Sequence, residues 1–262
     1  MVGALFFVVC MVCGRISVAA EQAGTIEVGM AALRFNYSEF SDAGSHLDTE
    51  MGGILGGTLK ATVKRHHWEI ETKWSYHQGQ VAYTGQSNFG TPYNTHTDEK
   101  IGDMAMRVGG WLDTRYPVMP FVGIGYRRWD RDILPATLGG LFESYQWKYA
   151  WLGTKVALPP SGTAQHMLDV GVLKPVHPEM SIDFKGAYNA SPRVYPESQL
   201  GIRVLITSNM RLTRAVYFVA EPYYEYWKLG RSSVVTQNGV SVYEPKSETK
   251  NVGFNVRIGK NF

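Results

Sequence analysis

A two-residue alternation of apolar and polar side chains constrains the fold of this chain more than any other feature of its sequence. In the last twelve residues, Val252, Phe254, Val256 and Ile258 alternate with polar residues or glycine up to the terminal Phe262. A period of two places successive side chains on opposite faces of a β-strand. Similar segments follow one another along most of the chain, which predicts an all-β protein.

Ten segments carry this pattern. We expect strands at residues 25–39, 51–64, 67–83, 100–114, 119–131, 143–158, 165–174, 198–207, 213–229 and 248–262. The connections alternate between short turns and long polar loops, and the long loops are expected at 41–50, 84–99, 132–142, 175–197 and 229–247. This asymmetry is typical of bacterial transmembrane barrels, whose tilted strands need about 9–11 residues to cross. The expected fold is an all-β, transmembrane, antiparallel up-and-down β-barrel of about ten strands.

A closed sheet is the physical reason for this expectation, because in lipid every backbone N–H and C=O must be bonded within the protein. A soluble β-sandwich or a lipocalin-like barrel also alternates. Charges in the middle of strands, unequal loops and an export signal favour the membrane barrel. In the seventh segment Lys174 and Pro175 are expected to cut the strand short, so eight or twelve strands remain alternatives.

We interpret residues 1–20 as a signal peptide. The run VGALFFVVCMVCG is too short to cross a bilayer as a helix, and SVAA before Glu21 is a plausible cleavage site near Ala20. Valine precedes both Cys10 and Cys13, so we expect no lipid anchor. Residues 21–262 would then form one barrel domain without a disulfide. The net charge of +3 gives no electrostatic reason to expect nucleic acid as a partner.

A set of charged residues falls on the polar face of the expected strands. The members are Lys60, Glu69, Glu71, Lys73, Arg107, Arg127, Arg203, Glu221, Glu225 and Arg257. Such charges persist in a narrow lumen only when they are paired and hydrogen-bonded. Barrels of about eight strands are filled by side chains, whereas water-filled channels appear at about 16–18 strands. We therefore expect a charge network that closes the lumen, with a narrow path for ions or small solutes as the alternative.

Aromatic residues gather near the long-loop ends of the expected strands, where a membrane-facing girdle would lie. They are Tyr37, Tyr76, Tyr83, Tyr126, Tyr145, Trp147, Tyr224, Tyr226 and Trp227.

Four stretches of the chain resemble the small outer-membrane β-barrel proteins of Gram-negative bacteria, often called porin-like. They are PFVGIGYRRWDRD, ESYQWKYAWLGTKVAL, FVAEPYYEYWKLGRSS and EPKSETKNVGFNVRIGKNF. The resemblance implies a location in the bacterial outer membrane, surrounded by its lipid. It also implies that the last strand, with Phe254, Val256, Ile258 and Phe262, is the signal read by the barrel-assembly machinery.

Some barrels of this size are enzymes, so the rim of the expected barrel was considered as a site. Omptin proteases place Asp and His pairs at the extracellular rim, and this chain has Asp130, Asp132, His46 and Asp48 in comparable places. The flanking residues do not match, and no histidine accompanies a Gly-x-Ser-x-Gly elbow as in lipid hydrolases. We expect no catalytic residue, metal ligand or cofactor. The expected role is structural or in surface interaction, with a narrow porin and a rim enzyme as alternatives and any ligand of the long loops unknown.

Overall fold

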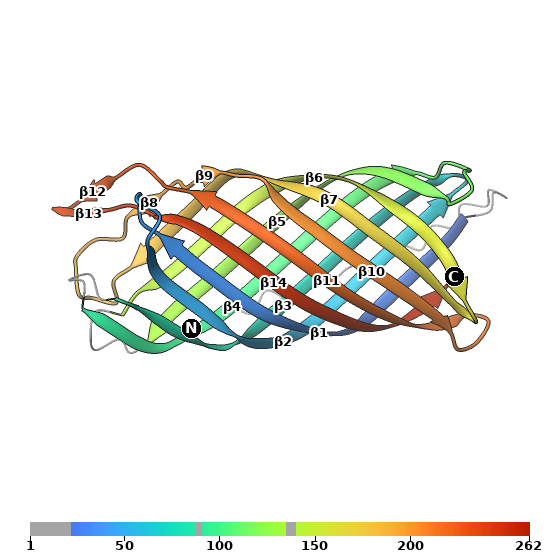
Figure 1. The fold of residues 1–262 in the computed structure, drawn as a ribbon, viewed down its shortest axis with the longest axis horizontal. Helices are drawn as coiled ribbons and strands as arrows, with labels where there is room; N and C mark the ends of the chain where they lie inside the picture. The colour runs from blue at the N-terminus through green and yellow to red at the C-terminus, as the bar shows by residue number, and fades with distance from the viewer. Residues whose placement is uncertain (1–21, 87–90, 135–139) are drawn as a thin grey trace, which may run out of the picture.

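The computed structural model describes residues 22–86, 91–134 and 140–262, and the predicted signal peptide lies outside them. The described chain forms a closed, antiparallel up-and-down β-barrel with ten long strands (Figure 1). These strands are β1 (Gln22–Phe40), β2 (His46–Arg65), β3 (Trp68–Gln86), β4 (Pro92–Gly110), β5 (Val118–Leu134), β6 (Phe142–Ser161), β7 (Ala164–Asp183), β10 (Gly201–Arg211), β11 (Val216–Gly230) and β14 (Lys246–Asn261). The predicted fold class is therefore confirmed.

The first and last strands close the barrel. In this ladder Val28 lies opposite Ile258 and Ala32 lies opposite Phe254. At its end the backbone N–H of Gly24 donates to the carbonyl of Phe262, and the N–H of Phe262 donates to the carbonyl of Gly24, both at 3.0 Å. The sheet therefore has no free edge along its membrane-crossing part, as a lipid environment requires.

Four short strands lie in the connections at the end of the barrel opposite the short turns (Figure 1). They are β8 (Arg193–Val194), β9 (Glu197–Ser198), β12 (Val235–Gln237) and β13 (Val240–Val242). β8 pairs with β7 and β9 pairs with β11, while β12 and β13 form a separate hairpin. By the convention of this class the short turns are periplasmic, so these strands belong to the extracellular end. Within the described residues, no helix has the length and apolar character needed to span a bilayer.

The seventh strand was predicted to stop at Pro175, and this prediction was wrong. β7 continues to Asp183, with a shift in its register against β6 between Gln146 and Lys148. Pro175 lies just past the end of the β7–β10 ladder, whose last pair is Leu173 with Gly201. A proline is tolerated there because that edge of the strand no longer needs an N–H donor. The hydroxyl of Ser198 donates to the Pro175 carbonyl and so occupies part of this edge.

The long strands also extend beyond the predicted ends, at the expense of the predicted loops. The connection expected at 41–50 occupies only residues 41–45, and β4 begins at Pro92 instead of residue 100. The barrel is therefore longer than a membrane requires, and its extracellular part is itself β-sheet.

The outer surface of the periplasmic half is apolar. Val28, Leu55, Ile124, Leu152 and Val252 are each more than half exposed, and all point away from the lumen. We take as membrane-spanning the segments that carry this surface, namely residues 24–33, 54–65, 68–77, 101–112, 118–127, 149–160, 164–173, 201–211, 216–225 and 251–262. The strand parts beyond them form the extracellular part of the barrel.

In the extracellular part large aromatic side chains face the lumen instead of the outside. The predicted girdle was therefore partly wrong. Tyr76, Tyr126 and Tyr224 do face outward, but Tyr37, Tyr83, Tyr145, Trp147 and Trp227 are buried inside the barrel. The cause is the solvent around the barrel. Above the lipid the outside is wet, so aromatic side chains gain more from facing inward, as they do in a soluble protein.

Candidate functional site

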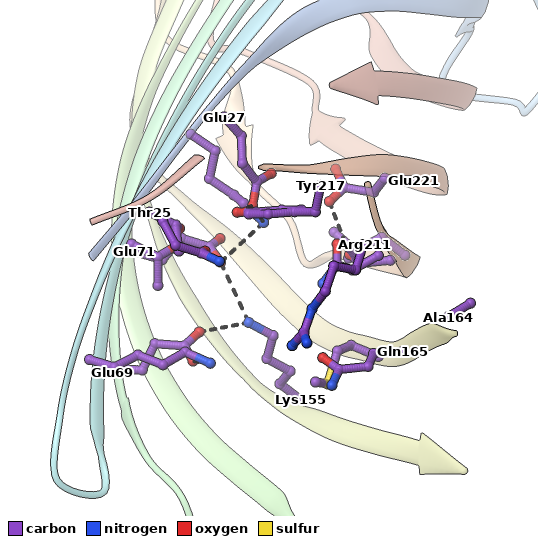
Figure 2. A pocket seen from close by; sticks show the side chains of 18 of the residues that line it. Thr25, Glu27, Glu69, Glu71, Lys155, Ala164, Gln165, Arg211, Tyr217 and Glu221 are labelled. Atoms are coloured by element: carbon purple, nitrogen blue, oxygen red, sulfur yellow. Dashed lines mark hydrogen bonds and ion pairs between the residues drawn. The ribbon is translucent and has the colours of Figure 1, made fainter. Parts of the chain in front are cut away.

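The periplasmic half of the lumen contains a cavity of about 750 Å³. Residues of two of the periplasmic turns, Gly162 and Thr163 in one and Leu212 to Arg214 in the other, line it together with inward-facing side chains of the strands. Figure 2 shows Lys155 extending across the cavity toward Glu69, with Arg211 and Gln165 on another wall. Eight lysine and arginine side chains line the cavity against four glutamates, so its surface carries an excess of positive charge.

A first group of ion pairs surrounds Glu71 on the cavity wall. Arg107 donates to Glu71 at 2.9 Å and also to Asp169. Lys155 lies 3.6 Å from Glu71 and 2.6 Å from Glu69, so it bridges the two carboxylates. Asp169 and Lys155 were not among the residues predicted for this network.

A second group centres on Arg257, which is fully buried. Its Nε donates to Glu27 at 2.7 Å, and its two terminal nitrogens donate to Glu221 at 3.0 and 2.6 Å. Glu221 also accepts from Lys73 at 2.8 Å and from Thr207 at 3.0 Å. The carboxylate of Glu221 is thus satisfied from three directions, as a charge in a narrow lumen requires.

A third group lies nearer the extracellular end. Arg127 donates to Glu225 at 2.6 Å, and the Nε of Arg203 donates to the same carboxylate at 2.8 Å. Asp103 lies 3.6 Å from Arg127 and 3.5 Å from Arg203. The cavity beside this group has a volume of only about 30 Å³.

The structure brings together all ten residues of the predicted charge set. Each faces the lumen and takes part in at least one ion pair, and all except the partly buried Lys73 are buried. Sequence reasoning missed Glu27, Asp103, Lys155 and Asp169. Glu27 could have been found, because it lies between Ile26 and Val28 on the polar face of its strand.

Above the ion pairs, aromatic rings fill the lumen. Trp129 stacks on Tyr145 with ring centres 4.6 Å apart and meets Tyr37 edge-on at 4.9 Å. Trp227 meets Trp147 edge-on at 5.5 Å. The guanidinium of Arg127 lies over the rings of Trp147 and Trp227, which joins this aromatic layer to the ion pairs below it.

A single arginine holds a cluster of carboxylates in the extracellular part. Arg131 is fully buried and lies within 4 Å of four carboxylates, those of Glu39, Asp48, Glu50 and Glu143. Two further carboxylates, Glu99 and Glu244, accept hydrogen bonds from Trp129 and Tyr145 on the edge of the same cluster. Six acidic groups thus share one cation, and we call them, with Arg131, the Arg131 cluster.

The excess of acid in the Arg131 cluster shifts its titration. Burial raises the pKa of Glu143 to about 7, aided by the neighbouring Glu39 and Glu50 and opposed by Arg131. Burial also raises the pKa values of Asp48 and Glu244 well above their ordinary values, and Glu39 adds to both shifts. These groups lie outside the membrane-spanning segments.

The stability of the protein is expected to fall as the pH rises from 5 to 8. A carboxyl group whose pKa is higher in the folded than in the unfolded chain stabilises the fold at low pH, and loses that contribution as the pH passes its folded pKa. For Glu143 this window runs from about 4.5 to about 7. Urea unfolding in detergent, followed by tryptophan fluorescence at several pH values, measures it. A free energy of unfolding that rises between pH 5 and 8 would contradict the shifted titration.

The residues considered for a rim protease do not form a common site. Asp130 faces outward, where it accepts from Arg128 at 3.1 Å, and Asp132 pairs with Lys185. Asp48 instead faces the lumen in the Arg131 cluster, and His46 packs against Phe40 at the rim. Among the described residues, no group of three or more His, Cys, Asp or Glu side chains has an arrangement that could hold a metal ion.

A solved outer-membrane protein shares this architecture, and two further solved structures match less well. The outer membrane protease OmpT of Escherichia coli matches with a TM-score of 0.58 at 13% sequence identity, over 93% of this chain and 98% of that one. The outer membrane protein OprG of Pseudomonas aeruginosa matches with a TM-score of 0.42 at 12% identity, over 93% and 97% of the two chains. The Pseudomonas putida toluene transporter TodX matches with a TM-score of 0.42 at 7% identity, over 92% and 90%. No protein-family model and no curated protein sequence matches the chain.

At 13% identity the likeness to the protease establishes the fold and leaves the activity open, since one barrel fold carries many functions. A closed barrel with an apolar outer band and a polar, charged interior indicates the bacterial outer membrane as its location. The chain thus has the fold of the Gram-negative outer-membrane β-barrel proteins.

Proposed function

We propose that the protein is a closed outer-membrane barrel with a structural or surface-interaction role, and that it neither conducts nor catalyses. The observation that carries the proposal is the way side chains fill the lumen. The ion pairs around Glu71 and Arg257 lie on the wall of the periplasmic cavity, and the ion pairs around Glu225 and an aromatic layer follow toward the extracellular end. Moving any one group would leave buried charges unpaired, which costs several kcal/mol.

The ordered extracellular part supports a role in surface contact. The hairpin formed by β12 and β13 docks on the connection between β7 and β10, where Gln237 accepts from the backbone N–H of Ser191 at 2.9 Å. Asn238 donates to the backbone carbonyl of Asn189 at 2.7 Å. Tyr188, Tyr195 and Tyr243 are exposed nearby on these two connections. Exposed tyrosines on braced loops are suited to binding another surface, because little conformational entropy is lost on contact.

The periplasmic cavity favours a narrow porin as the second candidate. The cavity has room for water up to the level of the Arg127–Glu225 group, so only the lumen from that group to the extracellular end would need to open. Solute uptake by proteoliposomes separates the two functions. Swelling in isotonic arabinose at the rate of protein-free liposomes supports the closed barrel, whereas swelling that scales with the amount of protein supports the porin. A general porin reconstituted in parallel is the positive control.

The C-terminal strand is proposed to be the segment that the barrel-assembly machinery recognises. The variant Phe262→Ala is expected to lower the amount of folded protein in the outer membrane several-fold without blocking export across the inner membrane. It keeps the backbone hydrogen bonds with Gly24, and the ring of Phe262 is 70% exposed in the folded barrel, so its loss removes little packing. Membrane fractionation and heat-modifiable gel migration measure the effect. The variant Tyr116→Ala, which removes an exposed ring from a periplasmic turn, is a control for general disturbance. Normal levels of Phe262→Ala would refute the assignment.

A further inference from the structure

A belt of basic residues surrounds the barrel on its outer surface, just beyond the apolar band. Its seven members come from seven different strands and are Arg34, Lys100, Arg128, Lys148, Lys174, Lys228 and Lys250. We call this set the basic belt. It is separate from the lumen charges, because these side chains point to the opposite side of the sheet.

The belt lies at the extracellular edge of the apolar band. Arg34 is the next outward residue after Ala32, and Lys148 is the next one beyond Ala150. The ladders link these positions around the barrel: Arg34 lies opposite Val252, and Lys148 lies opposite Tyr126. Since strands tilt through the membrane, a residue two positions past the apolar surface lies near the lipid headgroups.

The belt carries far more positive charge than its surroundings neutralise. Within the described chain Arg34, Lys100 and Lys148 are exposed and form no ion pair with an acidic side chain. Arg34 donates to the Met51 sulfur at 3.8 Å. Lys228 and Lys250 share the single carboxylate of Glu248 at 3.5 and 3.1 Å.

The other belt members and the nearest outward acids do not cancel this excess. Arg128 pairs with Asp130 at 3.1 Å, and Lys174 donates to the backbone carbonyl of Ser198 at 2.8 Å. Asp98 lies two positions further from the membrane than Lys100, and Gln80 already donates to it at 3.2 Å. Outward cations therefore outnumber the carboxylates beside them.

The opposite edge of the apolar band lacks such a belt. On the described strands, the outward-facing charges at the periplasmic edge are Arg65 of β2 and Lys260 of β14. The surface instead offers apolar residues there, such as Trp68 and Phe262, which are both more than half exposed. The two leaflets thus meet different surfaces, and only the outer one meets a ring of cations.

We infer that the basic belt binds the phosphate groups of anionic lipids in the outer leaflet. Lysine and arginine side chains at the headgroup level attract anionic headgroups, and arginine can hold a phosphate with two parallel hydrogen bonds. The outward tyrosines Tyr76, Tyr126 and Tyr224 lie just inside the belt and contact the upper acyl chains. The barrel is thereby held at one depth and is surrounded by selected lipids. This inference concerns the outer surface of the barrel and does not depend on the proposal that the lumen is closed.

The test measures binding of lipid A, which carries two phosphates, to detergent-purified protein by native mass spectrometry. The variant Arg34→Gln/Lys100→Gln/Lys148→Gln removes the three belt cations without an acidic partner. At about fivefold in affinity for each cation near the headgroups, the apparent Kd should rise about a hundredfold. The matched control Arg65→Gln/Lys260→Gln removes two outward cations from the periplasmic edge and should bind as the wild type does. Equal binding by the triple variant and the wild type overturns the inference.

Two further binding measurements identify the chemical group that the belt recognises. Dephosphorylated lipid A should bind at least tenfold more weakly than lipid A, and equal binding would mean that the acyl chains, and not the phosphates, are recognised. Inorganic phosphate at millimolar concentration should not displace lipid A, because a free anion lacks the contact with the apolar band. Complete displacement would assign the belt to free phosphate and overturn the lipid assignment. Heat-modifiable migration of each variant shows that its barrel is folded, so loss of binding is separable from loss of structure.

Discussion

Replacing Arg131 by methionine lowers the free energy of unfolding by about 3–5 kcal/mol at pH 8, and by much less at pH 5. Four carboxylates lie within 4 Å of this arginine, and among the described residues it is their only cation. At pH 8 the variant must either bury unpaired charges or take up protons, and both cost free energy. At pH 5 Glu143 and Asp48, whose pKa values burial raises, take up protons at little cost, so fewer unpaired charges remain in the variant.

Another arginine of the same strand provides the matched control. Arg128→Met alters an arginine of the same strand that faces outward, is largely exposed and pairs with Asp130. An exposed pair of this kind contributes about 0–1 kcal/mol, at either pH. Denaturant unfolding of both variants at pH 5 and pH 8 gives the comparison. A loss of stability for Arg131→Met that is the same at the two pH values would mean that packing, and not charge, accounts for the role of Arg131.

The second large effect concerns the aromatic layer. The triple variant Trp129→Ala/Trp147→Ala/Trp227→Ala is expected to open the extracellular half of the lumen to water, so that ions can reach and pass the remaining ion pairs. It should then give single-channel currents in planar bilayers where the wild type gives none. These three rings contact one another or their aromatic neighbours at 4.6 to 5.6 Å and are all buried. The currents should favour chloride over potassium, because eight cations and four glutamates line the cavity beneath.

The matching control removes aromatic rings from the outside. Trp68→Ala/Trp74→Ala/Tyr126→Ala truncates three exposed residues of the lipid-facing surface and leaves the lumen unchanged. This variant should give no single-channel current. If the lumen variant folds, as heat-modifiable migration shows, and is also silent, then the ion pairs alone close the barrel. Cation-selective currents would contradict the charge balance assigned to the cavity.

The membrane-spanning half of the barrel could be predicted from the sequence because one rule governs it: apolar residues that face lipid alternate with polar residues that face the lumen. Leu59 faces lipid and Lys60 faces the lumen, as the alternation indicates, and the same holds for Phe254 and Arg257 on the last strand. This alternation was enough to assign the ten charged residues to the lumen. It could not predict which of them pair, because Glu27 and Arg257, for example, are 230 residues apart and meet only when β1 and β14 close the barrel.

The extracellular half could not be predicted in the same way. Alternation shows that Phe35 and Tyr37 share a face with Leu33, but it does not say whether water or lipid surrounds the other face. The aromatic residues were therefore placed in a girdle, although most of them fill the lumen. The predicted end of the seventh strand at Pro175 was wrong for a related reason. A strand tolerates a proline where the neighbouring strand has ended, and the position of that end is a property of the assembled sheet.

Single-channel recording of the wild-type protein in a planar bilayer is the most direct test of the closed barrel. With insertion verified by heat-modifiable migration of the protein recovered from the same preparation, the account predicts no steady current across the usual range of voltages. In the proposed function the ion pairs around Glu71, Arg257 and Glu225, together with the rings above them, close the lumen. A reproducible, steady open-channel current from the wild-type protein would contradict it.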